Sequence, residues 1–169
     1  QQPYQPGRQE PMNPHPASEM ATYQGSGKLA GKVAIVTGGD SGIGRAVAIG
    51  FAKEGADIAI IYLEETKDAI DTRNLVENTG RICKTFAGDV SDESFCKRTV
   101  DEISSYYRKI DILVNNAGEQ HVTESIEQIE SEQIIRTFKT NIFSMFYMVK
   151  AVLTYMSEGS TIINTASIT

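Results

Sequence analysis

Short apolar runs alternate with segments of helical periodicity along most of the chain. Runs rich in β-branched residues predict strands at residues 32–37, 57–63, 81–90, 111–118 and 160–167. Apolar side chains recur at helical spacing over residues 43–55, 66–79, 91–107 and 131–156. Strands that alternate with helices of this length form parallel sheets through right-handed crossovers, with helices on both faces. The pattern therefore predicts an α/β fold with a doubly wound, Rossmann-type sheet.

Residues 1–28 differ from the rest of the chain, because they hold all five prolines and show no sustained apolar periodicity. Such a segment has too little apolar mass to offset its ordering entropy, so we expect a tail that is disordered or draped over the surface. The alternative is an arm that crosses to a neighbouring subunit, anchored by Tyr4, Met12, Met20 and Tyr23. The chain then divides into a proline-rich tail, 1–28, and a Rossmann-type domain, 29–169.

The net charge of the 169-residue chain is −6. A nucleic acid or an anionic membrane would require a basic face, so we expect neither partner. No apolar run reaches the roughly 18 residues of a membrane span, and the N-terminus lacks the basic-then-apolar layout of a signal peptide. These features favour a cytoplasmic protein.

Cysteine and histidine are too sparse to suggest a metal or redox centre. Cys83 and Cys96 fit no zinc or redox spacing, so we expect two reduced and partly buried thiols. His15 and His121 lie far apart, with no cluster of ligating residues near either. The sequence predicts no metal site.

A glycine-rich stretch, TGGDSGIGRA (37–46), lies between the first predicted strand and the first predicted helix. A helix N-terminus offers N–H groups and a partial positive charge, which favour an anion such as pyrophosphate. Gly38, Gly42 and Gly44 would let the backbone turn sharply, approach the phosphates and pack the helix on the sheet. No Gly-Lys-Ser/Thr follows, which disfavours the phosphate loop of ATPases. A glycine-rich turn without a ligand is the alternative.

Polar or small residues stand at the carboxyl ends of the predicted strands, where open parallel sheets bind their ligands. They are Tyr62, Glu64 and the segments 88–90 (GDV), 115–118 (NNAG) and 165–167 (TAS). Each has a structural alternative, such as a turn at Asp89 or a helix cap at Ser167. Their recurrence at one edge favours a ligand site. Gln120 and His121, just beyond, either line the mouth of a substrate pocket or belong to a solvated loop.

Asn141 interrupts an apolar stripe of the last predicted helix, which consists of Ile134, Phe138, Met145, Val149, Val152 and Met156. A buried amide needs a hydrogen-bond partner, so the spacing favours a side chain tied to a neighbouring backbone carbonyl. The functional alternative is a residue that holds a water or a proton relay beside the site.

Together these residues resemble the short-chain dehydrogenase/reductase family, over residues 32–169. The lead-in and the segments GGDSGIGRA and NIFSMFYM are similar to its general-stress and glucose/ribitol dehydrogenase-like branch with extended N-termini. The resemblance implies a cofactor site formed by Gly38, Asp40, Ser41, Gly42, Ile43, Gly44, Tyr62, Leu63, Asp89, Val90, Asn116, Ala117 and Gly118. It also implies two catalytic residues, Ser167 on the substrate oxygen and Asn141 in a proton relay.

The resemblance implies an oxidoreductase that transfers a hydride between a nicotinamide dinucleotide and a small alcohol or carbonyl substrate, sugar-like or ketone-like. It further implies a homo-oligomer, a tetramer in the family. The family's general acid/base is a tyrosine with a lysine four residues later, and no tyrosine of this chain has such a lysine. We therefore expect the Tyr-xxx-Lys pair beyond Thr169, in a C-terminal part that is missing here, and an inactive chain without it. Alternatives are a dinucleotide-binding protein without turnover and, less well supported, a flavodoxin-like or nucleotide-hydrolysing domain.

The form of the cofactor depends on the end of the second predicted strand. An acidic residue there holds the ribose hydroxyls of NAD, whereas arginine accepts the extra phosphate of NADP. Tyr62 and Leu63 occupy these places, Glu64 and Glu65 follow, and Arg45 is the nearest cation. Two acids disfavour a phosphate, so the sequence favours NAD and leaves NADP open.

Overall fold

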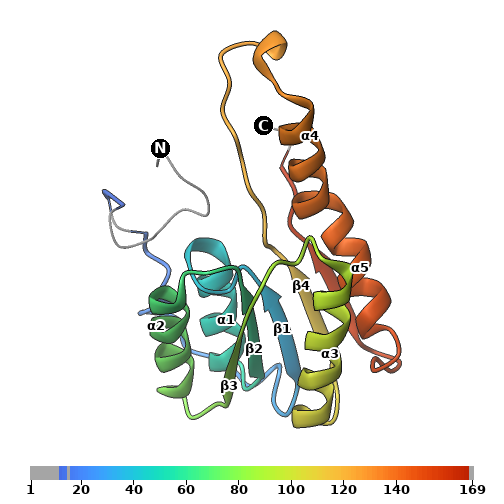
Figure 1. The fold of residues 1–169 in the computed structure, drawn as a ribbon. Helices are drawn as coiled ribbons and strands as arrows, with labels where there is room; N and C mark the ends of the chain where they lie inside the picture. The colour runs from blue at the N-terminus through green and yellow to red at the C-terminus, as the bar shows by residue number, and fades with distance from the viewer. Residues whose placement is uncertain (1–11, 15, 168–169) are drawn as a thin grey trace.

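The fold is a parallel sheet between two layers of helices (Figure 1). The structure, a computed structural model, describes residues 12–14 and 16–167. Its strands are β1 (Val33–Thr37), β2 (Asp57–Tyr62), β3 (Cys83–Ala87), β4 (Ile112–Asn115) and β5 (Thr161–Asn164). Its helical segments are α1 (Gly42–Lys53), α2 (Thr66–Glu77), α3 (Glu93–Tyr107), η1 (Ile126–Gln128), α4 (Ser131–Phe138), η2 (Lys139–Phe143) and α5 (Ser144–Val152). All neighbouring strands are parallel, in the order β3-β2-β1-β4-β5, which confirms the predicted doubly wound sheet.

Side chains of the central strands enter two separate apolar clusters, one on each face of the sheet. In β1, Ala34 and Val36 belong to the cluster that includes α1 and α2, whereas Ile35 belongs to the cluster that includes α3 and α5. Alternate side chains of a strand point to opposite faces, so a strand covered on both sides must be apolar throughout. This accounts for the uninterrupted apolar run of β1, in which every residue is buried.

The strands β3, β4 and β5 end three residues before the ends of their predicted ranges. After β3, the Gly88 N–H still donates to the Tyr62 carbonyl at 2.8 Å, and Gly88 then turns the chain with a φ of +156°. Residues 88–90, 116–118 and 165–167 therefore lie in loops at one edge of the sheet. This edge carries the polar residues that the sequence singled out.

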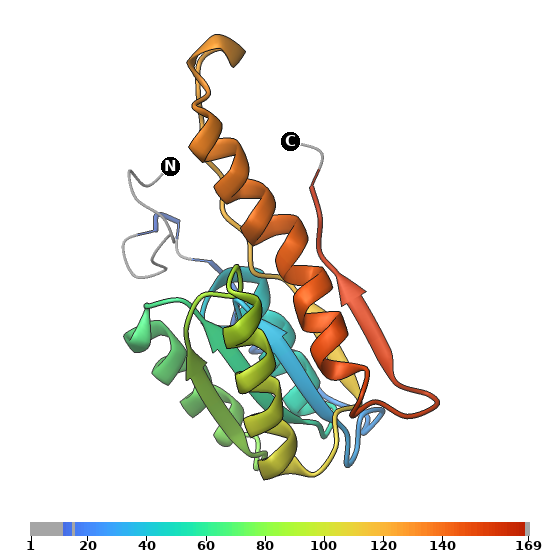
Figure 2. The same cartoon turned by 45° about the vertical axis from the view of Figure 1, so that its right-hand side comes forward.

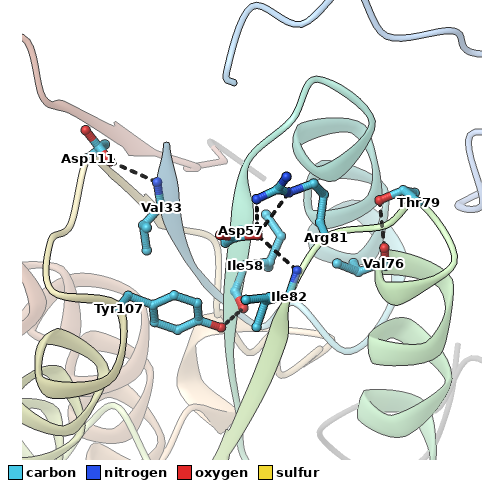
Figure 3. A network of polar contacts seen from close by, with 9 residues as sticks. All are labelled: Val33, Asp57, Ile58, Val76, Thr79, Arg81, Ile82, Tyr107 and Asp111. Carbon is cyan, nitrogen blue, oxygen red and sulfur yellow. Dashed lines mark hydrogen bonds and ion pairs between the residues drawn. The ribbon is translucent and has the colours of Figure 1, made fainter. Parts of the chain in front are cut away.

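The opposite, amino edge of the sheet is held by polar contacts between strand starts and their neighbours (Figure 3). The Asp57 carboxylate accepts hydrogen bonds from Arg81 Nη2 at 2.6 Å and from the N–H of Ile82 at 2.9 Å. The Asp111 carboxylate accepts from the N–H of Val33 at 2.9 Å, and the Tyr107 hydroxyl donates to the Ile58 carbonyl at 2.7 Å. These side chains close the amino edge with structural contacts.

The segments α4, η2 and α5 follow one another without a break and rise beyond the carboxyl edge of the sheet (Figures 1 and 2). The predicted apolar stripe of this helix is buried only in its lower part. Val152 is fully buried, whereas Ile134 and Phe138 are 47% and 52% exposed, because the upper turns have no sheet beneath them. Among the described residues, no helix combines the length and apolar character that crossing a bilayer requires.

Part of the N-terminal segment lies against the C-terminal end of α1. The Glu54 carboxylate accepts hydrogen bonds from the N–H groups of Ser26 and Lys28, at 3.0 and 2.9 Å, and from the Tyr23 hydroxyl. Lys53 Nζ donates to the carbonyls of Met20 and Tyr23. Two of the predicted anchors thus contact their own chain. Tyr4 and His15 lie outside the described residues, and the domain boundary at residue 28 stays a prediction.

Candidate functional site

A cavity of about 350 Å³ opens at the carboxyl edge of the sheet. Its walls come from the loops that follow all five strands and from the helix that rises beyond them. The lining residues are Gly38, Asp40, Ser41, Gly42, Ile43, Ile61, Tyr62, Leu63, Glu65, Gly88, Asp89, Val90, Asn116, Ala117, Gly118, Glu119, Arg136, Thr140 and Thr165. They include every predicted cofactor-binding residue except Gly44. Their role in binding stays a prediction, but the structure brings them around one space.

The glycine loop is shaped by close backbone approaches. Gly38 has a φ of +63°, and a Cβ there would lie 3.0 Å from the Cα of Ala117. A Cβ on Gly44 would lie 2.0 Å from the carbonyl oxygen of Gly38, so only glycine lets α1 start this close to β1. Gly44 therefore acts in packing α1 and not in lining the cavity. The N-terminal turn of α1 faces the cavity through Ser41, Gly42 and Ile43, which presents its partial positive charge to a bound anion.

The ends of β1 and β4 are joined where the strand order reverses. The Thr37 hydroxyl accepts hydrogen bonds from the N–H groups of Asn116 and Ala117, at 2.9 and 3.0 Å. The Asn116 amide in turn donates to the carbonyls of Thr37 and Gly38, each at 3.3 Å. Neighbouring strands whose crossovers run to opposite sides leave a crevice between them, and ligands of doubly wound sheets bind there. Asn116 holds the base of this crevice.

Arg45 lies inside the protein and binds other parts of the chain. It is 5% exposed, and its Nε donates to the Asp40 carbonyl at 3.0 Å and to the Thr72 hydroxyl at 2.8 Å. Its Nη2 donates to the carbonyls of Asp40 and Asp68 and lies 3.6 Å from the Asp68 carboxylate. Arg45 therefore connects the glycine loop to α2. The guanidinium is engaged there and does not line the cavity.

Two carboxyl groups line the part of the cavity beside β2. Burial raises the pKa of Asp40 above its usual value. Burial also raises the pKa of Glu65, and the negative charges of Glu64 and Asp40 add to this effect. The surroundings of these groups thus disfavour additional negative charge.

The segment after β3 combines a turn with a buried thiol. The Asp89 carboxylate accepts from the Ser91 N–H at 2.8 Å, which is the turn-forming role that the sequence allowed. Cys96 Sγ contacts the Val90 carbonyl oxygen at 3.2 Å, and burial raises the pKa of its thiol to about 12. Burial likewise raises the pKa of Cys83 to about 12, and both cysteines are free. Such thiols stay protonated at neutral pH and are poor nucleophiles.

Asn141 is half-buried in η2, a short π-helical stretch within the long helix. Its Oδ1 accepts from the Glu119 N–H and its Nδ2 donates to the Glu119 carbonyl, both at 2.8 Å. The amide is thus tied to the backbone, as the structural alternative predicted, and it fixes the loop after β4. π-helical turns occur often at functional sites, because they re-aim side chains within a helix.

Ser167 is exposed and does not line the cavity, although Thr165 of the same segment does. Gln120 is also exposed and outside the lining, and His121 approaches the cavity only through Glu119, with 3.3 Å between His121 Nε2 and Glu119 Oε1. Sequence reasoning missed Glu119, Arg136 and Thr140. Glu119 directly follows the segment NNAG, but no spacing signal identified the two helical residues.

The sequence model described as short chain dehydrogenase matches residues 32–169 of the chain. The chain belongs to the short-chain dehydrogenase family. Its relatives include General stress protein 39 of Bacillus subtilis, 55% identical over 97% of this chain, and Glucose and ribitol dehydrogenase of Daucus carota, 44% identical over 97% of this chain. The alignments cover 57% and 58% of those two proteins, so the chain spans little more than half the length of the relatives that it matches.

Solved structures of this family share the fold. A short-chain dehydrogenase from Burkholderia cenocepacia in complex with NADP is 33% identical and superposes with a TM-score of 0.81, over 83% of this chain and 57% of that one. Carveol dehydrogenase from Mycobacterium avium in complex with NAD is 30% identical and superposes with a TM-score of 0.73, over 77% of this chain and 51% of that one. The membership implied by the sequence motifs is thereby confirmed.

Proposed function

We propose that the full-length protein is an oxidoreductase that transfers a hydride between a nicotinamide dinucleotide and a small alcohol or carbonyl substrate, sugar-like or ketone-like. The observation that carries this proposal is the cavity at the reversal of strand order, which opens beside a glycine-shaped helix N-terminus. Two related proteins, a glucose and ribitol dehydrogenase and a carveol dehydrogenase complexed with NAD, support it.

The residues around the cavity fit a dinucleotide. Gly38 and Gly42 would hold a pyrophosphate at the start of α1, Tyr62 and Leu63 would hold the adenosine ribose, and Asp89 with Val90 would hold the adenine, since all six residues line the cavity. When bound, the nicotinamide supplies or accepts the hydride. For the remaining chemistry, Ser167 would bind the substrate oxygen and Asn141 would support a proton relay, the two catalytic roles that the family resemblance implies. Asn141 also holds the loop at Glu119. No tyrosine of this chain has a lysine four residues later, so these residues do not include the family's acid/base pair.

Within this proposal the preferred cofactor is NAD. The described lining residues beside β2 and β3 contribute the carboxyl groups of Asp40, Glu65 and Asp89 and no cation. Arg45, the nearest basic residue of the loop, is engaged with α2. A 2′-phosphate would add negative charge beside Asp40 and Glu65. Burial at this place already disfavours the charged form of both carboxyl groups and raises the pKa of each.

Equilibrium titration of the full-length protein with NADH and NADPH, followed by nicotinamide fluorescence, tests the cofactor assignment. We expect NADH to bind at least about tenfold more tightly, or about 1.4 kcal/mol. Leu63→Arg should narrow or reverse this ratio, whereas Leu153→Arg, at an exposed position directly after α5 and outside the cavity lining, should not change it. Equal or tighter binding of NADPH by the wild-type protein would refute the NAD preference.

Turnover is tested separately, by the absorbance of reduced nicotinamide with NAD and a panel of sugars, polyols and secondary alcohols. Oxidation of a panel member supports the oxidoreductase. Tight NADH binding without turnover of any member, in either direction, would instead identify a dinucleotide-binding protein.

Assembly and location belong to the same proposal: a cytoplasmic homo-oligomer, with a tetramer as the family resemblance implies. Exposed apolar side chains on α4, η2 and α5, among them Ile135, Ile142 and Phe146, support association with further protein surface. Light scattering of the full-length protein after gel filtration measures its oligomeric state, and a monomer would refute the proposed homo-oligomer.

A further inference from the structure

Arg136 is the one cationic side chain that lines the cavity, among the residues that the structure describes. It stands on α4, on the other side of the crevice from the glycine loop and α1. Thr140, four residues further along the same helix, lines the cavity with it. The cation therefore lies at the part of the cavity that is built by the loop after β4 and the long helix, away from the adenosine end.

The guanidinium is anchored through one of its nitrogens only. Arg136 Nε donates to both carboxylate oxygens of Glu119, at 2.9 and 3.2 Å. The Glu119 side chain is 8% exposed, and its backbone is fixed by the two hydrogen bonds that it forms with the Asn141 amide, one donated and one accepted. The Arg136 side chain is 58% exposed, and its two terminal amino groups donate to no residue that the structure describes. A fixed support thus presents two unused donors to the cavity.

The terminal amino groups of arginine form a planar fork that matches the two oxygens of a carboxylate or a phosphate. Arginine held by a neighbouring carboxylate loses less side-chain freedom on binding, because its rotamer is already selected. Glu119 contacts the guanidinium at Nε, so the two terminal amino groups of the fork stay available to an anion. Charge-assisted hydrogen bonds to an anion are about twice as strong as those to a neutral acceptor, so the fork favours an oxyanion over a hydroxyl group.

We propose that Arg136, supported by Glu119, is an anion subsite that selects substrates with a carboxylate or phosphate group away from the reacting carbon. The inference rests on the proposed dehydrogenase function and names the substrate class of the same site.

The test compares carbonyl substrates that differ in the charged group. Succinic semialdehyde is paired with butanal, and glyceraldehyde 3-phosphate with glyceraldehyde, using the full-length protein and reduced cofactor. We expect kcat/KM to be at least about tenfold higher for the anionic member of one pair, which also distinguishes a carboxylate from a phosphate. Arg136→Gln should lower that kcat/KM by about 10- to 100-fold, mainly through KM, and leave the uncharged member within about twofold.

Two further variants separate the fork from its charge and from general effects. Arg136→Lys keeps the positive charge without the fork and should recover only part of the loss. Arg98→Gln removes an exposed arginine of α3, outside the cavity, and should match the wild-type protein. No preference for either anionic member, or a preference that survives Arg136→Gln, would overturn the subsite.

Failure of the subsite and failure of the proposed function give different results. If NADH does not bind, the dehydrogenase proposal fails. If NADH binds but none of the four carbonyls is reduced, calorimetric titration of the NADH complex with succinate and with glycerol 3-phosphate decides the subsite. The subsite proposal stands if either anion binds to the wild-type complex and Arg136→Gln abolishes that binding. It is rejected if neither anion binds to the wild-type complex, or if the variant binds the anion as tightly as wild type.

Discussion

Replacement of Arg45 by methionine tests whether the glycine loop depends on a buried cation. Methionine keeps most of the apolar stem, so the change removes chiefly the guanidinium and its contacts. The hydrogen bonds that disappear join Arg45 to the carbonyls of Asp40 and Asp68 and to the Thr72 hydroxyl, at 2.8 to 3.1 Å. The Asp68 carboxylate, in a residue only 7% exposed, also loses the cation that lies 3.6 Å away.

The expected loss of stability is large for a single substitution. Removing one partner of a buried ion pair costs about 3–5 kcal/mol, because the other charge stays in a poorly solvated place. The charged groups here are 3.6 Å apart, which is longer than a hydrogen bond, so we take the lower end of this range. Arg45→Met should therefore lower the free energy of unfolding by about 3 kcal/mol. It should also weaken dinucleotide binding, because the carbonyl of Asp40 loses its two hydrogen bonds from Arg45 and keeps the one from the Thr72 hydroxyl.

Urea unfolding of the full-length protein, followed by circular dichroism, measures the effect. The matched control is Arg73→Met on α2, whose Nε lies 4.0 Å from Glu77 at a position 39% exposed, and it should change stability by less than about 0.5 kcal/mol. In the double variant Arg45→Met/Asp68→Asn, the loss should be smaller than the sum of the single losses, because the buried Asp68 charge that faces Arg45 is removed as well. A loss below about 1 kcal/mol for Arg45→Met, or additive losses in the double variant, would refute this reasoning.

Four further substitutions test other parts of the structure. Gly44→Ala should abolish NADH binding and lower the melting temperature, because its Cβ would lie 2.0 Å from a backbone oxygen. As a control, Gly80→Ala lies at a φ of +81° with open space around the added Cβ, and it should lower the free energy of unfolding by only about 1–2 kcal/mol in urea. Asp92→Ala removes the side-chain cap of α3 and should cost about 1 kcal/mol in the same assay. The hydrogen bond from the Tyr23 hydroxyl, with those from the N–H groups of Lys28 and Ser26, lowers the pKa of Glu54 from 4.5 to about 2. The stability advantage of wild type over Glu54→Gln should therefore be full above pH 4.5 and vanish as the pH falls through about 2. An advantage that persists unchanged at pH 2 would rule out this role of Glu54.

The sheet could be predicted from sequence because its signal is local. Apolar runs of strand length and glycine at the loop positions report the environment of each residue without knowledge of its neighbours in space. The positions of Gly38, Ala117 and Asp89 around one cavity followed from the rule that parallel strands end at the same edge. The arrangement of the loops at the carboxyl edge of the sheet could therefore be predicted from the sequence.

The environment of the long helix could not be predicted in the same way. Helical spacing places Ile134 and Phe138 on the same stripe as Val152, but it does not say where the sheet beneath the helix ends. The anchoring of Arg136 by Glu119 likewise joins residues from a loop and a helix, and no pattern in either segment predicts the pair. For Arg45, sequence position indicates only proximity to the glycine loop, whereas the direction of its side chain is set by its contacts with α2.

The Thr37 hydroxyl joins the two walls of the crevice and so affects which part of a ligand the crevice can discriminate. Two N–H groups from the end of β4 converge on this single oxygen, which is itself buried, so both walls of the crevice are set before any ligand arrives. Association with a pre-arranged crevice requires little ordering of the chain, and whatever free energy it yields is the same for every ligand with the same pyrophosphate. In the proposed function, selection between two dinucleotides would then arise at the parts of the ligand beyond the pyrophosphate, where the cavity walls differ in charge, and selection among substrates at the helix that rises beyond the sheet.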